Sequence, residues 1–134
     1  DPLKDRHEFE ICHGEDSVLQ YFNNGLGLEY KGERHAIRRA FKENYDEEIV
    51  KKESGLIRIR FMVNCHGETD RFRLLAMDES YDEKEFDRSI TSQILQISKD
   101  LNGWQPMTLR GINRDYYQYL IFKIEHGRIT KILP

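Results

Sequence analysis

The segment from Gly55 to Asn64, Gly-Leu-Ile-Arg-Ile-Arg-Phe-Met-Val-Asn, constrains the fold of this chain more than any other. Apolar β-branched or aromatic residues occupy every second position from Ile57 to Val63. Period-2 alternation of this kind is typical of a half-buried strand. Gly67 follows in a turn-forming stretch, where it can adopt a positive φ, and a second strand is predicted at roughly Thr69 to Leu75. The pattern therefore predicts a β-hairpin.

A long helix is predicted after this hairpin. Ser80-Tyr-Asp-Glu83 fits a capping box, which predicts that the helix begins near Tyr81, and Gly103 is suited to stop it. Apolar residues repeat every three or four positions and form a stripe long enough to cover one face of a sheet: Phe86, Ile90, Ile94, Ile97 and Leu101.

The other periodic stretches complete an α+β pattern. They are a short helix at Glu15–Asn24, a helix at Glu33–Asn44, and strands at Tyr116–Glu125 and Arg128–Leu133. A loop is predicted after Pro106, up to Asp115, and a two-residue hairpin turn at His126-Gly127. We therefore predict a three- or four-stranded, mainly antiparallel sheet with helices packed on one face. The candidate edge strands are Arg128–Leu133 and Thr69–Leu75.

Length and composition indicate one folded domain without a nucleic-acid partner. The 134 residues are 38% hydrophobic and 11% aromatic, which argues against disorder, and a net charge of −3 does not favour nucleic-acid binding. No apolar run approaches the roughly 20 residues of a membrane-spanning helix. No membrane anchor is visible, and the abrupt start at Asp1-Pro2 is compatible with removal of a signal or anchor.

The two cysteines, Cys12 and Cys65, are compatible with one disulfide, but their spacing does not decide whether they pair. Each cysteine is followed by a histidine, His13 or His66. A Cys2His2 zinc site would require both Cys-His pairs to converge, and their separation matches no zinc module. We therefore expect no metal site and no cofactor.

The histidines do not indicate an enzyme. His66 and His126 stand before turn glycines, where turn formation explains a polar residue better than catalysis does. The two could approach each other only if both hairpin turns lay at the same end of the sheet. Because no nucleophile with a base, carboxylate pair or metal set is evident, we expect a non-enzymatic protein.

Five residues form a candidate interaction surface on the predicted sheet. Arg58 and Arg60 lie on the polar face of the first strand, where they could reach an acidic partner or simply keep the sheet soluble. Tyr117 and Tyr119 alternate with the core positions of their strand, and Arg128 begins a candidate edge. Trp104 can serve as a core anchor or as part of a recognition surface, and we favour the core.

The order of these features resembles the C-terminal domain of TonB and its relatives in Gram-negative envelopes. The resemblance covers roughly residues 31–134 and leaves residues 1–30 as an N-terminal extension. It rests on an opening helix after Lys31-Gly32, the alternating strand from Gly55, the turn glycine Gly67, Asp87 in the main helix, the Trp-x-Pro of Trp104 and Pro106, Gly111, and the closing strand Tyr116–Ile124.

This resemblance implies a protein-interaction domain in the periplasm or cell envelope of a Gram-negative bacterium. The partner would be another protein, or a second copy of the chain, bound by strand addition at a sheet edge. Gly55, Gly67, Trp104 and Pro106 would be structural. The alternative is a small-ligand-binding protein or enzyme with a pocket between sheet and helix, lined by Tyr117, Tyr119 and a histidine.

Overall fold

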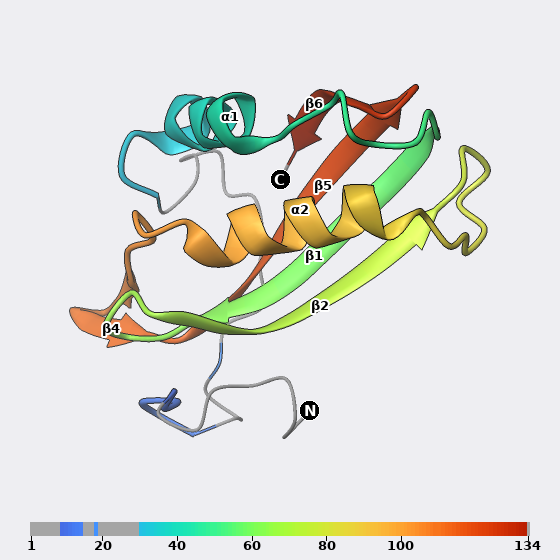
Figure 1. Ribbon diagram of the computed structural model, residues 1–134. Coiled ribbons are helices and arrows are strands. Elements are labelled where there is room, and N and C mark those ends of the chain that lie inside the picture. The colour runs from blue at the N-terminus through green and yellow to red at the C-terminus, as the bar shows by residue number, and fades with distance from the viewer. Residues whose placement is uncertain (1–8, 15–17, 19–29, 134) are drawn as a thin grey trace.

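A computed structural model describes residues 9–14, 18 and 30–133 of the chain (Figure 1). The predicted helix at Glu15–Asn24 therefore lies, apart from Val18, outside the described residues. The elements are α1 (Glu33–Asn44), β1 (Gly55–Val63), β2 (Thr69–Met77), α2 (Arg88–Asp100), β3 (Met107–Leu109), β4 (Ile112–Arg114), β5 (Tyr116–Glu125) and β6 (Arg128–Leu133).

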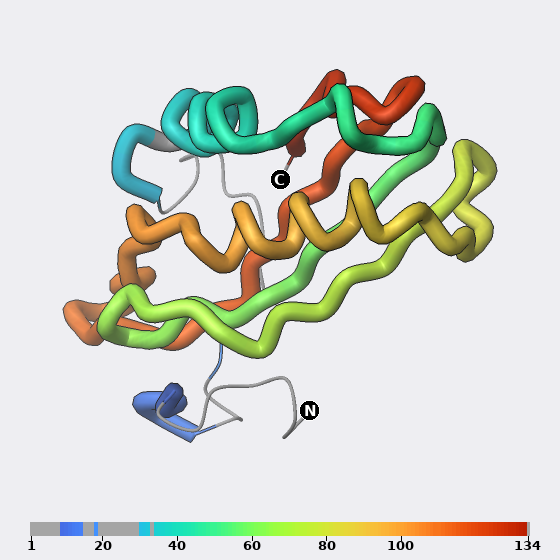
Figure 2. Tube along the Cα trace, viewed as in Figure 1, coloured from blue at the N-terminus to red at the C-terminus, as the bar shows by residue number. Residues whose placement is uncertain are grey.

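The main sheet has four antiparallel strands in the order β2-β1-β5-β6, and β3 pairs with β4 in a separate hairpin. The central strands β1 and β5 pair from Gly55 opposite Ile124 to Val63 opposite Tyr116. Helices α1 and α2 both cover the same face of this sheet (Figures 1 and 2). The α+β class with a four-stranded antiparallel sheet is thus present, and β2 and β6 are its edges.

The main core lies between the sheet and the two helices because alternate strand residues point the same way. On β1 the alternating set that starts at Ile57 is fully buried, as are Ile90 and Ile94 on α2. From α1, the Phe41 ring lies 4.8 Å from the ring of Phe122 on β5. The apolar stripe predicted from sequence therefore does cover the sheet.

The predicted helix start near Tyr81, with its capping box, is wrong because α2 begins at Arg88. The chain before α2 is instead held against β2. Glu83 forms an antiparallel bridge with Met77, and the next residue, Lys84, donates its backbone N–H to the Ala76 carbonyl at 3.0 Å. These contacts with a strand already in place outweigh the local capping signal.

Asp87 is the residue that caps α2. Its carboxylate accepts a hydrogen bond from the backbone N–H of Ser89 at 2.9 Å, which is the usual contact of an N-cap side chain. Hydrogen bonds from Ser89, together with the nearby charge of Lys51, hold the pKa of the Asp87 carboxyl below its usual range. Asp87 therefore lies at the helix N-terminus as an acceptor.

The segment predicted as a loop, from Pro106 to Asp115, contains the β3–β4 hairpin, so that prediction is wrong in part. Arg110 and Gly111 form its two-residue turn, with φ values of 55° and 75°. Positive φ at both central residues is the usual geometry of a tight hairpin turn, but an arginine there is a weak sequence signal. The hairpin strands are also only three residues long.

Trp104 is a core residue, as the sequence favoured. Its side chain is only 4% exposed, and its ring packs edge-to-face against the rings of Tyr30 and Phe61 at 4.8 and 5.1 Å. The Trp104 carbonyl lies above the β1–β2 turn, where a Cβ on Gly67 would come within 2.7 Å of its oxygen. Position 67 therefore favours glycine for two reasons: its φ is 80°, and a Cβ there would collide with the Trp104 carbonyl.

We expect Gly67→Ala to lower the free energy of unfolding more than Gly111→Ala does. Both glycines have positive φ, so both substitutions carry backbone strain of about 1–2 kcal/mol. At Gly67 the new methyl group also meets the Trp104 carbonyl, whereas nothing lies within 4 Å at Gly111. Overpacking adds about 1–3 kcal/mol. Urea denaturation measures the difference, and equal losses would contradict the close approach.

Candidate functional site

Four of the predicted surface residues lie together on the sheet face turned away from the helices. The Arg60 guanidinium lies 4.2 Å from the centre of the Tyr117 ring, and Arg58 lies 5.6 Å from that of Tyr119. Each arginine of β1 thus stacks over a tyrosine of the neighbouring strand β5. Because Tyr117 and Tyr119 point away from both helices, they do not line a pocket between sheet and helix.

Part of this face is covered by the N-terminal segment. Phe9 and Val18, each 8% exposed, bury Met62 of β1, and Ile11 and Tyr117 pack against the same group. Met62 is 1% exposed although it lies on the face away from the helices. The protein therefore has a second, smaller apolar cluster, and the first strand is apolar on both sides where the arm crosses it.

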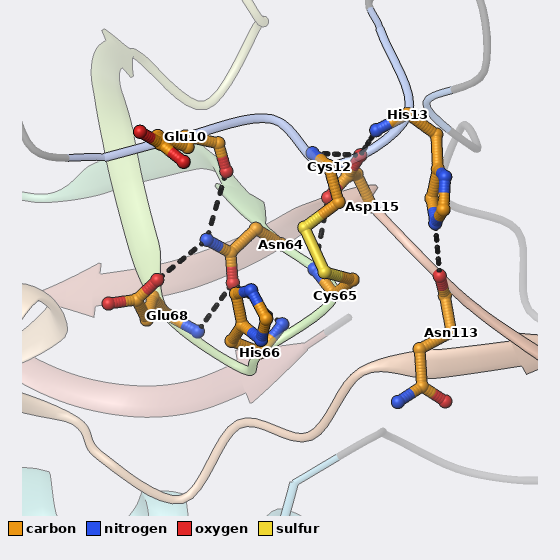
Figure 3. Close-up of a disulfide and its surroundings, with 9 residues drawn as sticks. All are labelled: Glu10, Cys12, His13, Asn64, Cys65, His66, Glu68, Asn113 and Asp115. Atoms are coloured by element: carbon orange, nitrogen blue, oxygen red, sulfur yellow. Dashed lines mark hydrogen bonds between the residues drawn. A yellow bond between two sulfur atoms is a disulfide. The ribbon is translucent and has the colours of Figure 1, made fainter.

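A disulfide joins this arm to the β1–β2 turn. Cys12 and Cys65, whose pairing the sequence left open, are bonded with their Cα atoms 6.0 Å apart (Figure 3). Their closed loop is long, with a sequence separation of 53. The bond therefore links two segments that no local sequence pattern connects, and it fixes the arm on the end of the sheet where β1 finishes.

Asp115 holds the same two segments through hydrogen bonds. One carboxylate oxygen accepts the backbone N–H groups of Cys12 at 2.9 Å and His13 at 3.1 Å, and the other accepts that of Cys65 at 3.0 Å (Figure 3). Asp115 is 1% exposed and precedes β5 directly. It is therefore a clamp, here called the Asp115 clamp, that joins the arm, the turn and the start of β5.

Asn64 reinforces the turn from within. Its side-chain amide donates to the Glu10 carbonyl at 3.0 Å and to the Glu68 carboxylate at 2.9 Å. Its side-chain oxygen accepts the backbone N–H groups of His66 and Glu68. Asn64 is fully buried, so this network satisfies an amide that would otherwise be costly to bury. The sequence alone singled out neither Asn64 nor Asp115 as a site residue.

Three of the described histidines, His13, His66 and His126, occupy separate places. His66 is exposed beside the disulfide, whereas the Nε2 of His13 is 2.9 Å from the Asn113 carbonyl oxygen, on the other side of the disulfide (Figure 3). His126 lies in the β5–β6 turn, where its backbone N–H donates a hydrogen bond to the Ser54 hydroxyl. Since β1 and β5 are antiparallel, the turns holding His66 and His126 lie at opposite ends of the sheet. Their conjectured approach is therefore wrong.

Arg128 lies apart from the other four surface residues, beside a groove of about 630 Å³ along the open edge of β6. We call it the edge groove. Its floor is apolar, with Phe41 of α1 and Ile132 of β6, both buried. The remaining lining residues are mostly charged or polar: Arg38, Lys42, Tyr45, Asp46, Glu47, Glu48, Arg128, Ile129, Thr130 and Lys131.

The edge groove is lined by charges of both signs, and one ion pair lies among them. Arg128 forms an ion pair with Glu47, with Nε 3.4 Å from the carboxylate oxygen. Arg38 and Lys42, one helical turn apart on α1, are exposed on the groove wall. The exposed acidic residues Asp46, Glu47 and Glu48 line the groove where the chain leaves α1, so an extended segment would meet cations along α1 and carboxylates beyond it.

The opposite edge, β2, is partly occupied by the chain itself. The Glu83 bridge to Met77 and the hydrogen bond from Lys84 to Ala76 use backbone groups at the end of β2. The start of β2 is irregular, since Arg71 has φ of 60° and the β1–β2 register shifts there. Bulges and covering segments both blunt an edge against further pairing. The β5–β6 pairing also shifts register, between Lys123 and Ile124, so among the described strands β6 differs from β2 in carrying no such covering bridge.

Comparison of the chain with protein-family models, curated proteins and solved structures found no match. A search of the described residues found no helix that is long and apolar enough to cross a membrane.

We expect Asp115→Ala to destabilise the protein by about 1.5–3 kcal/mol, because three partly buried N–H groups lose their charged acceptor. Asp82→Ala removes an exposed carboxylate with the same change of charge and serves as the control. Both proteins are compared by urea denaturation with the disulfide intact. If the free energy of unfolding fell no more than in the control, the Asp115 clamp would add no stability beyond that of the disulfide.

Tyr45, on the wall of the edge groove, should titrate unusually late. Burial and the neighbouring Glu47 raise the pKa of its phenol to about 12, and its hydroxyl donates to the Gly127 carbonyl at 2.7 Å. The unfolded chain loses this proton near pH 10, so the phenol's stabilising contribution is complete below pH 10 and lost as the pH rises toward 12.

Ultraviolet titration of tyrosinate measures this pKa. Tyr45→Phe should remove absorbance that appears near pH 12, while Tyr81→Phe, at a residue that is 73% exposed, should leave that step in place. Loss of the late step in the Tyr81 variant, or its persistence in the Tyr45 variant, would contradict the assignment.

Proposed function

We propose that this protein is a non-enzymatic interaction domain that binds an extended protein segment by strand addition to β6. The observation that carries the proposal is the open β6 edge with the edge groove beside it. An added strand would pair with the backbone of β6, and its alternate side chains would face the groove. The blunted β2 edge supports this choice of strand.

The partner segment should carry acidic residues where it lies against α1. Arg38 and Lys42 line that wall of the edge groove and are exposed, whereas the acidic Asp46, Glu47 and Glu48 line the part that follows α1. Complementary charge raises the association rate and rejects unsuitable partners. The apolar floor formed by Phe41 and Ile132 would accept one short apolar side chain between the acidic ones. An alternation of acidic and apolar residues therefore fits the edge groove.

We also propose that the domain works in the cell envelope, because the order of its sequence features resembles that of TonB C-terminal domains. The support is the hairpin from Gly55, the helix laid on its sheet, the buried Trp104 of Trp-x-Pro and the closing strand. A disulfide between Cys12 and Cys65 is compatible with an oxidising compartment such as the periplasm. The fold alone does not specify energy transduction, so the proposal is limited to binding.

The test is a selection of binding segments from a displayed library of random peptides, followed by nuclear magnetic resonance. A selected peptide should shift the backbone amides of β6 and those of α1 at the groove, and slow their hydrogen exchange. Shifts confined to β2, or to the Tyr117 and Tyr119 face, would contradict the proposed edge.

Charge reversal separates the groove from the helix as a whole. Arg38→Glu with Lys42→Glu should weaken the selected peptide about tenfold or more, since each lost charge contact is worth about 1 kcal/mol. Arg34→Glu with Arg39→Glu makes the same charge change on α1 away from the groove and should leave affinity nearly unchanged. Equal weakening by both pairs would contradict docking in the groove.

Two other outcomes would redirect the proposal. Dimerisation that rises with protein concentration, and that protects β6 amides, would make a second copy of the chain the occupant of the edge. A small molecule that raises the melting temperature, in the absence of any binding peptide, would favour the ligand-binding alternative.

A further inference from the structure

The disulfide end of the sheet contains three groups with the chemistry of a metal site. The ligand atoms of Cys12, Cys65 and His66 all lie within 4.8 Å of one another. Two sulfurs and an imidazole are the ligands that zinc and other borderline or soft cations select. The sequence argued against a Cys2His2 site because both Cys-His pairs would have to converge. In the structure the two cysteines do meet, and one histidine, His66, lies beside them.

We propose that reduction of Cys12–Cys65 converts this cluster into a Zn²⁺ site with two thiolates and the His66 imidazole as ligands. A dithiol reductant supplies two electrons and two protons to the S–S bond and becomes a disulfide itself. The Zn²⁺ ion then displaces both thiol protons, and two H⁺ are released. Because His66 is exposed, water completes a tetrahedral shell.

The site is held in place by contacts that do not depend on the S–S bond. The Asp115 clamp binds the backbone of Cys12 and of Cys65 on its two oxygens, so both residues stay close when the bond is cleaved. Asn64 fixes the backbone of His66 and, through the Glu10 carbonyl, the arm itself. Rotation about side-chain bonds is then enough to move the sulfurs to the roughly 3.8 Å separation that two Zn–S bonds of about 2.3 Å require.

The apolar contacts of the arm add to this preorganisation. Phe9 is buried against Met62, and Ile11 packs beside it. An arm held only by its disulfide would move away on reduction, and the two thiols would separate. This arm is also fastened by the Asp115 clamp and by the second apolar cluster, so a reduced pair remains assembled.

His13, which does not belong to the three-residue cluster, supplies a matched control. It follows Cys12 as His66 follows Cys65, but its Nε2 lies 2.9 Å from the Asn113 carbonyl oxygen, on the other side of the disulfide (Figure 3). The geometry therefore assigns a ligand role to one histidine of two that are equivalent in sequence context.

The experiment measures Zn²⁺ affinity by competition with a chromophoric chelator, using protein that is oxidised or reduced with a phosphine. Reduced wild type should bind one Zn²⁺ ion at least about 100-fold more tightly than the oxidised protein, because thiolate sulfurs bind Zn²⁺ and disulfide sulfurs do not. His66→Ala should weaken binding by the reduced protein at least about tenfold, and His13→Ala should leave it unchanged. Equal effects of the two histidine substitutions would overturn the proposal.

Two further measurements address folding and the thiolates. The amide spectrum of the reduced, metal-free protein should keep the resonances of a folded sheet, and an unfolded spectrum would overturn the preorganised site. Co²⁺ substituted for Zn²⁺ should give thiolate-to-metal charge-transfer absorption that is lost in Cys12→Ser. Binding by reduced wild type no tighter than by Cys12→Ser with Cys65→Ser would also overturn it. The inference is independent of strand addition at β6.

Discussion

The pairing of β1 with β5 is the constraint on which the rest of this protein depends. It runs without a register break from Gly55 opposite Ile124 to Val63 opposite Tyr116, and it lies at the centre of the sheet. Because strand side chains alternate, this register sends one apolar set under the helices and the Arg–Tyr pairs to the other face. A slip of one residue would bury Arg58 and Arg60 and expose the core.

The same pairing decides what meets at each end of the sheet. β1 finishes where β5 begins, so the turn after Val63 lies next to Asp115. One buried carboxylate can then bind the turn and the arm together, and the disulfide and His66 collect around it. The open β6 edge is a consequence of the same strand order, since β6 follows β5 through a tight turn and pairs with nothing else among the described strands. The proposed metal site and the proposed strand addition therefore concern separate parts of the fold.

The elements with strong local periodicity could be read from sequence with close bounds. The bounds of α1, β5 and β6 agree with those predicted, and β2 extends two residues past Leu75. The errors lie where local signals compete with tertiary contacts. The capping box at Ser80 satisfies every local rule, yet pairing with β2 keeps Glu83 extended, and a cap forms only at Asp87. The β3–β4 hairpin was missed because its strands are short and its turn begins with an arginine.

The sequence by itself determined the four strands of the main sheet, the faces they present and the α+β class, because alternation and helical spacing act between near neighbours. Only the tertiary structure decided that Cys12 meets Cys65, that Asp115 binds both, and that His66 joins them while His13 does not. These contacts link residues 50 to 103 positions apart, as the Asp115 hydrogen bonds show. Their geometry depends on strand order and on the path of the arm across the sheet, which no local pattern encodes.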